Sequence, residues 1–303
     1  MSDFLARALI GALITGAAAP AIGVYLVQRR LSLIGDGLGH VALTGVGLGL
    51  LLQRSPVLMA VLVAAAGAVV IELVRERGKT SGDVALAMLF YGGISGGVVL
   101  VNLSSSQSSR SLVSYLFGSL LTTTRQDLVV MGVLGAAVLA VAILGRPWLF
   151  AVCHDEEYAR VSGLPVRALN LTLAITTAVT VTVAMRAVGL LLVSALMVVP
   201  VATAQQVTRG FISTMAAGIG LGLLAAGGGI WVSATADTGP GATVVLLAIA
   251  GFFVVTVGAG AARAMRRRRP APADTEAGPG SRPADTGSRE VDHDSEVVLD
   301  RDY

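Results

Sequence analysis

Charged residues and cysteine are scarce in this sequence. Asp, Glu, Lys and Arg make up 14 % of the 303 residues, whereas a soluble domain contains about a quarter of such residues. The single cysteine, Cys153, excludes an intrachain disulfide framework and a C-x-x-C metal or redox motif. In contrast, 54 % of the residues are hydrophobic and the mean hydropathy is +0.77. Together these values indicate an all-α membrane protein, a polytopic bundle of transmembrane helices.

The motifs of several enzyme classes are missing as well. The sequence contains no G-x-x-x-x-G-K-[ST] loop, so this chain cannot bind and hydrolyse a nucleoside triphosphate by itself. It also contains no H-E-x-x-H and no G-x-S-x-G motif. We therefore expect a transport protein and not an enzyme. The pI of 9.4 does not indicate nucleic-acid binding, because the basic residues are spread between the apolar runs.

Apolar runs of membrane-spanning length recur through the first 262 residues and predict about eight or nine spans. The expected passes are 4–27, 33–52, 57–74, 82–101, 127–145, 168–185, 187–204, 211–232 and 242–262. The N-terminus lacks the features of a removable signal, so the first pass is expected to be retained. The segment "SLVSYLFGSLLTTTRQD", residues 111–127, is too short in its apolar part to span and is interpreted as a re-entrant or interfacial element.

The distribution of basic residues predicts the orientation of the spans. Fourteen basic residues near span ends fall on one side: Arg29, Arg30, Arg75, Arg77, Lys79, Arg146, Arg160, Arg167, Arg209, Arg263, Arg266, Arg267, Arg268 and Arg269. Five fall on the other side: Arg7, Arg54, Arg110, Arg125 and Arg186. The first side is expected to be cytoplasmic, with the N-terminus outside and the C-terminus inside.

Two regions of different composition are expected in the chain. Residues 1–265 form the transmembrane domain, and residues 266–303 form a cytoplasmic tail rich in Pro, Gly, Ser and acidic residues. Such a composition cannot bury a core, so the tail is predicted to be disordered.

One predicted span carries two ionisable residues, Asp36 and His40. Charged groups within a membrane are costly and usually functional. With Arg30 taken as the cytoplasmic edge, Asp36 lies ~9 Å and His40 ~15 Å along the helix, which places His40 near the midplane. A spacing of four puts both side chains on one helical face. A carboxylate and an imidazole are suitable ligands for zinc, manganese or ferrous iron.

The same span is rich in glycine, with Gly35 and Gly39 in one G-x-x-x-G pattern and Gly45 and Gly49 in another. This pattern predicts that neighbouring helix backbones approach closely beside the polar pair. The residues alone leave two interpretations open: an ion site, or a structural pair in which Asp36 and His40 bond to each other.

Four blocks of sequence, in this order, resemble a known family: "RRLSLIGDGLGHVAL", "YLFGSLL", "AVGLLLVSALMVVPVATA" and "ADTGPGATVVLLA". The chain is similar, over residues 4 to 262, to the membrane permeases of bacterial zinc, manganese and iron ABC importers, especially the high-affinity zinc-uptake type. The resemblance implies a homodimer in the bacterial cytoplasmic membrane, surrounded by lipid. It also implies an extracytoplasmic metal-binding protein and two separate ATP-binding cassette ATPase subunits as partners.

In this resemblance, Asp36 and His40 match the metal-site motif of the family. The metal, most often zinc, is the transported substrate, and no permanently bound cofactor is expected. The chain departs from many relatives at Gly39, where Ser or Ala is frequent, and at "LTG", residues 43–45, where manganese-type relatives often have an "LPG"-like sequence.

The segment "RPWLFAVCHDEEYARVSGLPVRALN" matches the place where such permeases carry the helix that docks into the ATPase. The resemblance implies a contact formed by Glu157, Tyr158, Ala159 and Gly163. Without the resemblance, the acidic run of residues 155–157 is explained by the preference for acidic residues at the start of a helix.

Two further residues are weaker candidates for the pathway or a gate. Pro200 is expected to kink or break its span and to free a carbonyl, and a packing kink is the simpler reading. Asp237 lies in a Gly/Pro turn, where Asp commonly caps its own backbone.

Two other functions remain open at this stage. A stand-alone secondary transporter could use Asp36 and His40 to relay protons and would need no ATPase. A membrane scaffold that transports nothing could keep the two residues as a structural pair.

Overall fold

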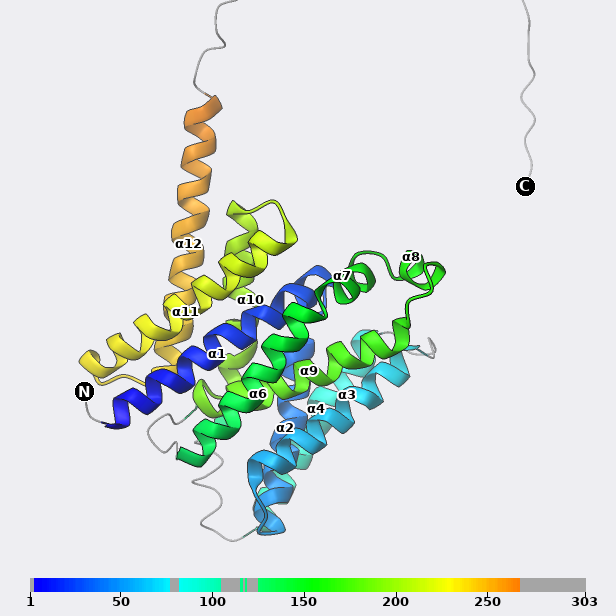
Figure 1. The fold of residues 1–303 in the computed structure, drawn as a ribbon. Helices are drawn as coiled ribbons and strands as arrows, with labels where there is room; N and C mark the ends of the chain where they lie inside the picture. The colour runs from blue at the N-terminus through cyan, green and yellow to red at the C-terminus, as the bar shows by residue number, and fades with distance from the viewer. Residues whose placement is uncertain (1–2, 77–81, 105–114, 117, 119–124, 268–303) are drawn as a thin grey trace, which may run out of the picture. The chain divides into compact units, whose positions relative to one another are not determined.

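The structure, a computed structural model, describes residues 3–76, 82–104, 115, 116, 118 and 125–267, and every regular element among them is an α-helix (Figure 1). The helices are α1 (Asp3–Gln28), α2 (Ile34–Leu51), α3 (Pro56–Glu76), α4 (Gly82–Leu103), α6 (Arg125–Leu144), α7 (Arg146–His154), α8 (Glu156–Val161), α9 (Val166–Ala187), α10 (Leu190–Val207), α11 (Phe211–Ala236) and α12 (Pro240–Arg267). The expected all-α helical fold is confirmed.

The chain divides into two compact units, residues 1–262 and 263–303. The expected boundary, between 265 and 266, falls inside the last turns of α12. Residues 268–303, on which the predicted disordered tail falls, lie outside the described residues.

Eight of the described helices are long and apolar enough to cross a membrane: α1, α2, α3, α4, α6, α9, α11 and α12. The remaining expected pass, 187–204, corresponds to α10, which has 18 residues and begins at Leu190. The turn before it contains Gly189, which takes a positive φ of 92°. Leu190 packs beside Gly39 of α2.

Helix α1 and helix α2 are the two centres of packing in residues 1–262. Helix α1 contacts α6, α9, α10 and α11, and α2 contacts α3, α4, α9 and α10.

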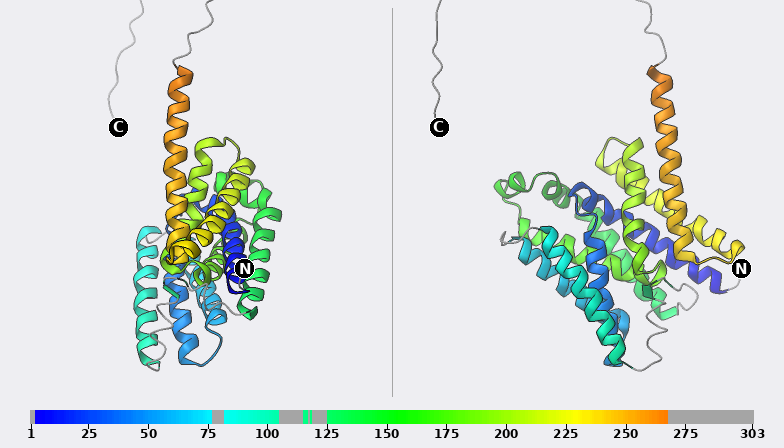
Figure 2. Two further views of the ribbon diagram at one scale, coloured as in Figure 1. Left: turned by 90° about the vertical axis from the view of Figure 1, so that its left-hand side faces the viewer. Right: turned by 180° about the vertical axis from the view of Figure 1, so that it is seen from behind.

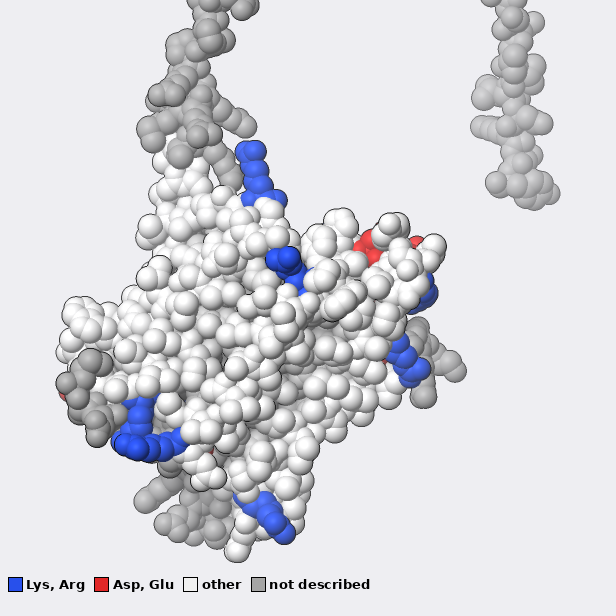
Figure 3. All heavy atoms as spheres, viewed as in Figure 1, with Lys and Arg blue, Asp and Glu red and all other residues white. Residues whose placement is uncertain are grey.

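Figure 2 shows α12 and α11 side by side at the start of α12, where Val244 is buried against Gly229. The later turns of α12 expose apolar side chains such as Phe253 and Val257. The face seen in Figure 3 is mostly uncharged, with blue and red atoms confined to a few places. Such a surface suits a multi-pass membrane protein.

Ionic contacts join helix ends that the expected orientation places on one side. Arg29 at the end of α1 binds Glu156 of α8 and Asn170 near the start of α9. At the opposite ends, Arg186 of α9 binds Asp127 of α6 at 2.6 Å. Both sets of contacts agree with spans that alternate in direction through the membrane. Which side of the membrane each set faces stays a prediction.

Part of the expected re-entrant element is described. The Tyr115 ring is buried and lies 5.3 Å from the guanidinium carbon of Arg186. Gly118, with a φ of 76°, packs against the backbone of Val188 in the turn before α10. Tyr115 and Gly118 are therefore packed against other parts of the protein, as an element inside a membrane must be, whereas Arg125 to Asp127 already belong to the start of α6. Residues 105–114, 117 and 119–124 lie outside the described part.

Glycine brings α2 and α4 into backbone contact. A methyl group on Gly93 of α4 would lie 2.5 Å from the carbonyl carbon of His40. The Thr44 hydroxyl donates a hydrogen bond of 2.7 Å to the Gly93 carbonyl one turn further along. On the other sides of α2, Gly45 faces the backbone of Ala60 in α3 and Gly35 faces Ser194 in α10. The close backbone approach that the glycine pattern predicts is confirmed at Gly45. Beside the polar pair it is made by Gly93 instead, because Gly35 and Gly39 face side chains.

The short helix α7 is held to the bundle mainly by aromatic rings. The Phe150 ring lies 4.8 Å from Phe211, and Phe211 lies 5.1 Å from Tyr25 of α1. Cys153 packs against the core from the same helix. Burial raises the pKa of the Cys153 thiol to about 11, although the Arg29 guanidinium acts in the opposite direction.

We expect Gly93→Ala to separate α2 from α4 beside His40 and to lower the free energy of unfolding by about 1–3 kcal/mol, as over-packing does. Gly92→Ala is the matched control, because a methyl group on Gly92 meets no atom within 4 Å. That control should gain stability from its better helix propensity. Thermal unfolding of the detergent-solubilised proteins measures both, and equal stability of the two variants would contradict the α2–α4 contact.

Alkylation of Cys153 should be slow at neutral pH, because only the thiolate reacts. With a pKa of about 11, the thiolate fraction and the alkylation rate should rise about tenfold per unit from pH 7 to 9 and show no plateau there. A control with Cys153→Ala and Val161→Cys carries its cysteine at an exposed position and should level off near pH 9. Stopped-flow maleimide labelling measures the profiles, and a Cys153 plateau at pH 9 would refute the buried environment.

Candidate functional site

The connection between α1 and α2 sets the depth of the polar pair. Arg30 takes the left-handed conformation, with a φ of 59°, and ends the path of α1. Helix α2 therefore begins at Ile34, so that Asp36 lies in its first turn. Counting from Ile34, Asp36 lies ~3 Å and His40 ~9 Å along the helix. Both residues thus lie about one turn nearer to the start of α2 than to Arg30, and their depth in the membrane stays a prediction.

The His40 side chain is buried between α2 and α4. It is 8 % exposed, and its ring meets the Phe90 ring edge-on, with centroids 4.3 Å apart and planes at 72°. Among the described residues, His40 Nδ1 is buried and has no hydrogen-bond partner. Buried polar atoms are almost always paired, so this nitrogen is available for a ligand that the described residues do not supply.

Asp36 lies one turn earlier on the same face and is half-buried. Within the described part of the chain no hydrogen bond joins its carboxylate to His40, whose Nδ1 stays unpaired. A carboxylate in the first turn is also favoured by the dipole of α2. The described contacts thus do not support a structural pair in which these two residues bond to each other.

Two side chains near the pair were not anticipated from the sequence. Phe90 forms one wall of the His40 environment. Ser194 of α10 has a buried hydroxyl oxygen without a partner among the described residues, and this oxygen faces Gly35 in the first turn of α2. Phe90 and Ser194 lie near the pair only because α4 and α10 pack against α2 in this register. The sequence around each of them gives no indication of this position. No group of three His, Cys, Asp or Glu residues that could hold a metal is found among the described residues.

The acidic run before the predicted docking contact forms the start of α8. Asp155 caps this helix, its carboxylate accepting a hydrogen bond of 2.9 Å from the Tyr158 amide. Glu157, Tyr158 and Gly163 are exposed, and Gly163 has a φ of 78° that turns the chain after the helix. Ala159, in contrast, is fully buried with Val152 and Val166. Ala159 therefore anchors α8 to the bundle and cannot itself touch a partner.

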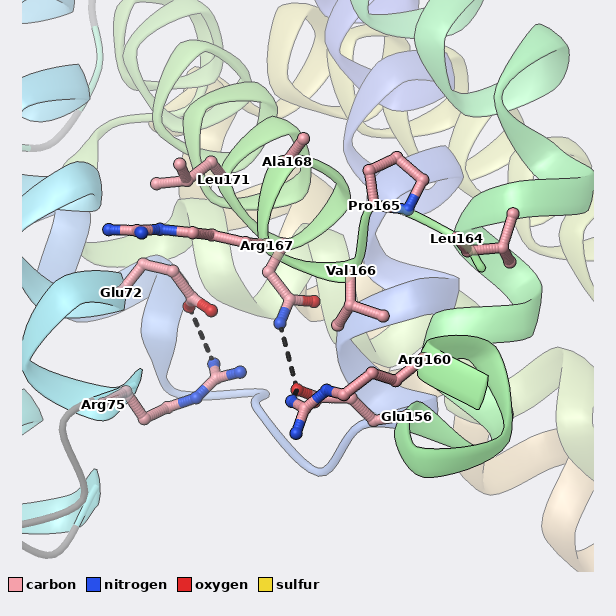
Figure 4. Close-up of a pocket in the computed structure, with 11 residues that line it drawn as sticks. Glu72, Arg75, Glu156, Arg160, Leu164, Pro165, Val166, Arg167, Ala168 and Leu171 are labelled. Atoms are coloured by element: carbon pink, nitrogen blue, oxygen red, sulfur yellow. Dashed lines mark hydrogen bonds and ion pairs between the residues drawn. The ribbon is translucent and has the colours of Figure 1, made fainter. Parts of the chain in front are cut away.

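A hollow of about 840 Å³ lies beside α8, lined by residues of α3, α8 and α9 (Figure 4). Glu72 and Arg75 of α3 form an ion pair of 3.2 Å on one side. Glu156 and Arg160 of α8 form the other side, as Figure 4 shows. Because its lining carries both acidic and basic side chains and its volume is large, we interpret this hollow as a solvent-filled space between the ends of these helices.

The two weaker candidates, Pro200 and Asp237, lie inside α10 and at the end of α11. Helix α10 continues through Pro200 to Val207, so the span is not broken. Pro200 is buried and has no amide hydrogen, which leaves the Leu196 carbonyl without its usual helix partner. Asp237 is exposed and ends α11 in the left-handed conformation, with φ 50° and ψ 40°. Its place is a helix C-cap, made by the backbone and not by the side chain.

Comparison with known proteins agrees with this architecture. Residues 1–259 match the model of the ABC 3 transport family. The chain is 31 % identical over 246 residues to the high-affinity zinc uptake system membrane protein ZnuB of Haemophilus influenzae, covering 81 % of this chain and 94 % of that protein. It is 29 % identical to the manganese transport system membrane protein MntC of Halalkalibacterium halodurans, covering 81 % and 84 %.

A solved structure has the same arrangement of helices. PsaBC from Streptococcus pneumoniae in complex with Fab superposes with a TM-score of 0.76 at 26 % identity, over 84 % of this chain and 91 % of that one. A family match across nearly the whole transmembrane region, together with this likeness in fold, places the sequence in one group of transport subunits. The chain belongs to the ABC 3 transport family of membrane permeases.

Proposed function

We propose that this chain is the permease subunit of an ABC importer for a divalent transition metal, with zinc as the principal substrate and manganese or ferrous iron as alternatives. One observation carries the proposal: a buried imidazole with an unpaired Nδ1, one helical turn from a half-buried carboxylate. Membership of the ABC 3 transport family and the zinc and manganese relatives support it.

The donor atoms favour a borderline cation. An imidazole nitrogen and a carboxylate oxygen both bind zinc well, whereas a magnesium site is built from oxygen ligands. A transport site must also release its ion, and two ligands from this chain bind more weakly than a closed four-ligand cage. His40 and Asp36 would hold the metal in transit while access changes from one side to the other.

The exposed face of α8 is the proposed contact with the ATPase. Glu157, Tyr158 and Gly163 project from it, and Ala159 fixes the helix from behind. A large aromatic side chain on a short projecting helix is a typical anchor at an interface. Tyr158 is therefore the residue on which docking should depend most.

The remaining parts of the proposal follow from the resemblance to metal importers. An extracytoplasmic protein delivers the metal, two copies of the chain form the pathway, and the C-terminus lies in the cytoplasm of a bacterium. The apolar side chains that α12 exposes, such as Phe253 and Val254, suit contact with lipid or with the second copy.

We expect His40→Gln and Asp36→Asn each to lower zinc uptake by roughly tenfold or more, because each removes a ligand. His154→Gln is the matched control, since this histidine is exposed on α7, and it should import normally. Uptake of radiolabelled zinc and manganese by cells that express each variant is the measurement. Normal zinc uptake by His40→Gln would overturn the ligand assignment.

Transport by the purified permease distinguishes an ABC importer from a proton-coupled secondary transporter. The permease alone in proteoliposomes should move no metal under a proton gradient, and addition of the ATPase subunits, the binding protein and ATP should start transport. Metal movement by the permease alone would favour the secondary transporter.

Tyr158→Ala should reduce co-purification of the ATPase with the tagged permease by about tenfold, as expected for a central anchor worth more than 1 kcal/mol. Tyr91→Ala is the control, because Tyr91 is nearly as exposed, at 67 % against 69 %, but lies on α4. Equal recovery of the ATPase with both variants would refute docking through Tyr158.

A further inference from the structure

Arg29, at the end of α1, reaches two other helices at once. Its Nη2 donates a hydrogen bond of 2.7 Å to Glu156 Oε2 in α8. Its Nη1 donates one of 2.7 Å to Asn170 Oδ1 in α9. The arginine side chain is only 9 % exposed and that of Glu156 is 37 % exposed. Charge-assisted bonds of this length in a partly buried place are among the stronger polar contacts in a protein.

The other oxygen of Glu156 completes the network. Glu156 Oε1 accepts from Asn170 Nδ2 at 3.5 Å, the contact drawn as a dashed line in Figure 4. Arg160 of α8 also approaches this oxygen at 3.5 Å, but its side chain is 70 % exposed, so water competes with the contact. Arg29 is therefore the main link between α8 and the rest of the bundle through Glu156.

The turn between Arg29 and α2 is short and held by backbone hydrogen bonds. Arg30 takes a positive φ, and its amide bonds to the Val27 carbonyl. The Leu31 amide bonds to Leu26 at 2.8 Å, and the Ile34 amide bonds to Leu31 at 3.0 Å. These bonds tie the turn both to the end of α1 and to the start of α2, so a displacement of Arg29 shifts the start of α2, where Asp36 lies.

Helix α8 does not need the Glu156 carboxylate in order to fold. Its N-terminus is capped by Asp155, and Ala159 packs with Val152 and Val166. The preceding helix, α7, is attached separately through Phe150 and Phe211. Removal of the Glu156 charge should therefore release one link and leave the segment in place.

We propose that Arg29 is a positioning residue that transmits movement of α8 to α2, through Glu156 and the tight turn before Ile34. The link joins the proposed ATPase contact to the helix that carries Asp36 and His40. The inference rests on the proposed function, because it requires that α8 receives the ATPase.

The test uses the complete transporter in proteoliposomes, with its ATPase subunits and binding protein. Metal imported per ATP hydrolysed is measured for wild type, Glu156→Gln and Arg29→Gln. Each variant should keep ATP hydrolysis within about twofold while its import per ATP falls by roughly tenfold, a typical size for coupling between sites. Arg209→Gln is the control, because it removes an exposed arginine between α10 and α11 and should keep the wild-type ratio.

A double variant separates coupling from general destabilisation. If Arg29 and Glu156 form one link, then Arg29→Gln combined with Glu156→Gln should lower the ratio no further than either change alone. Additive losses, or hydrolysis and import that fall together at an unchanged ratio, would overturn the inference.

Failure of the proposed function gives a different result. A wild-type complex that imports no metal would overturn the proposed function and this inference with it. A wild-type complex that imports normally, beside variants with an unchanged ratio, would overturn the inference alone.

Discussion

The backbone contact between α2 and α4 is the constraint on which the candidate site depends. In a bilayer the lipid tails are as apolar as leucine, so helices associate through close packing and not through a hydrophobic driving force. Gly93 allows the α4 backbone to meet that of His40, and the Thr44 hydroxyl fixes the register of the two helices. The same register places Phe90 against the imidazole. The glycines and the buried imidazole thus belong to one arrangement, in which small residues make room for a costly polar group.

Much of the fold could be predicted from hydropathy. The start of α3 at Pro56 and the end of α6 at Leu144 agree with the expected passes to within one residue, because each border is marked by a sharp change from polar to apolar sequence. The end of α1 at Gln28 and the start of α2 at Ile34 also agree with the expected passes 4–27 and 33–52 to within one residue. The left-handed backbone of Arg30 between them was not predicted. Helix α10 begins three residues later than the expected pass 187–204, because the turn at Gly189, which has a positive φ, precedes it.

The candidate site could be predicted only in part. The pair Asp36 and His40 is visible in the sequence because ionisable residues are rare in apolar runs, and their shared face follows from helical spacing. Phe90 and Ser194 are ordinary residues of other helices, and only tertiary register brings them near α2. Similarly, sequence could not separate buried Ala159 from its exposed neighbour Tyr158, because a six-residue helix is too short for its apolar face to show as a period.

Gly92 and Gly93 are adjacent glycines of α4. A methyl group on Gly92 would meet nothing within 4 Å, whereas one on Gly93 would meet the His40 backbone. At residue 93 even one methyl group must displace a neighbouring backbone, while residue 92 has room for one. We expect relatives that share about 30 % of their residues with this chain to vary most on the surfaces that face lipid. Their freedom should end at the few positions where two backbones touch, and those positions set how far the family can diverge while keeping a site beside α2.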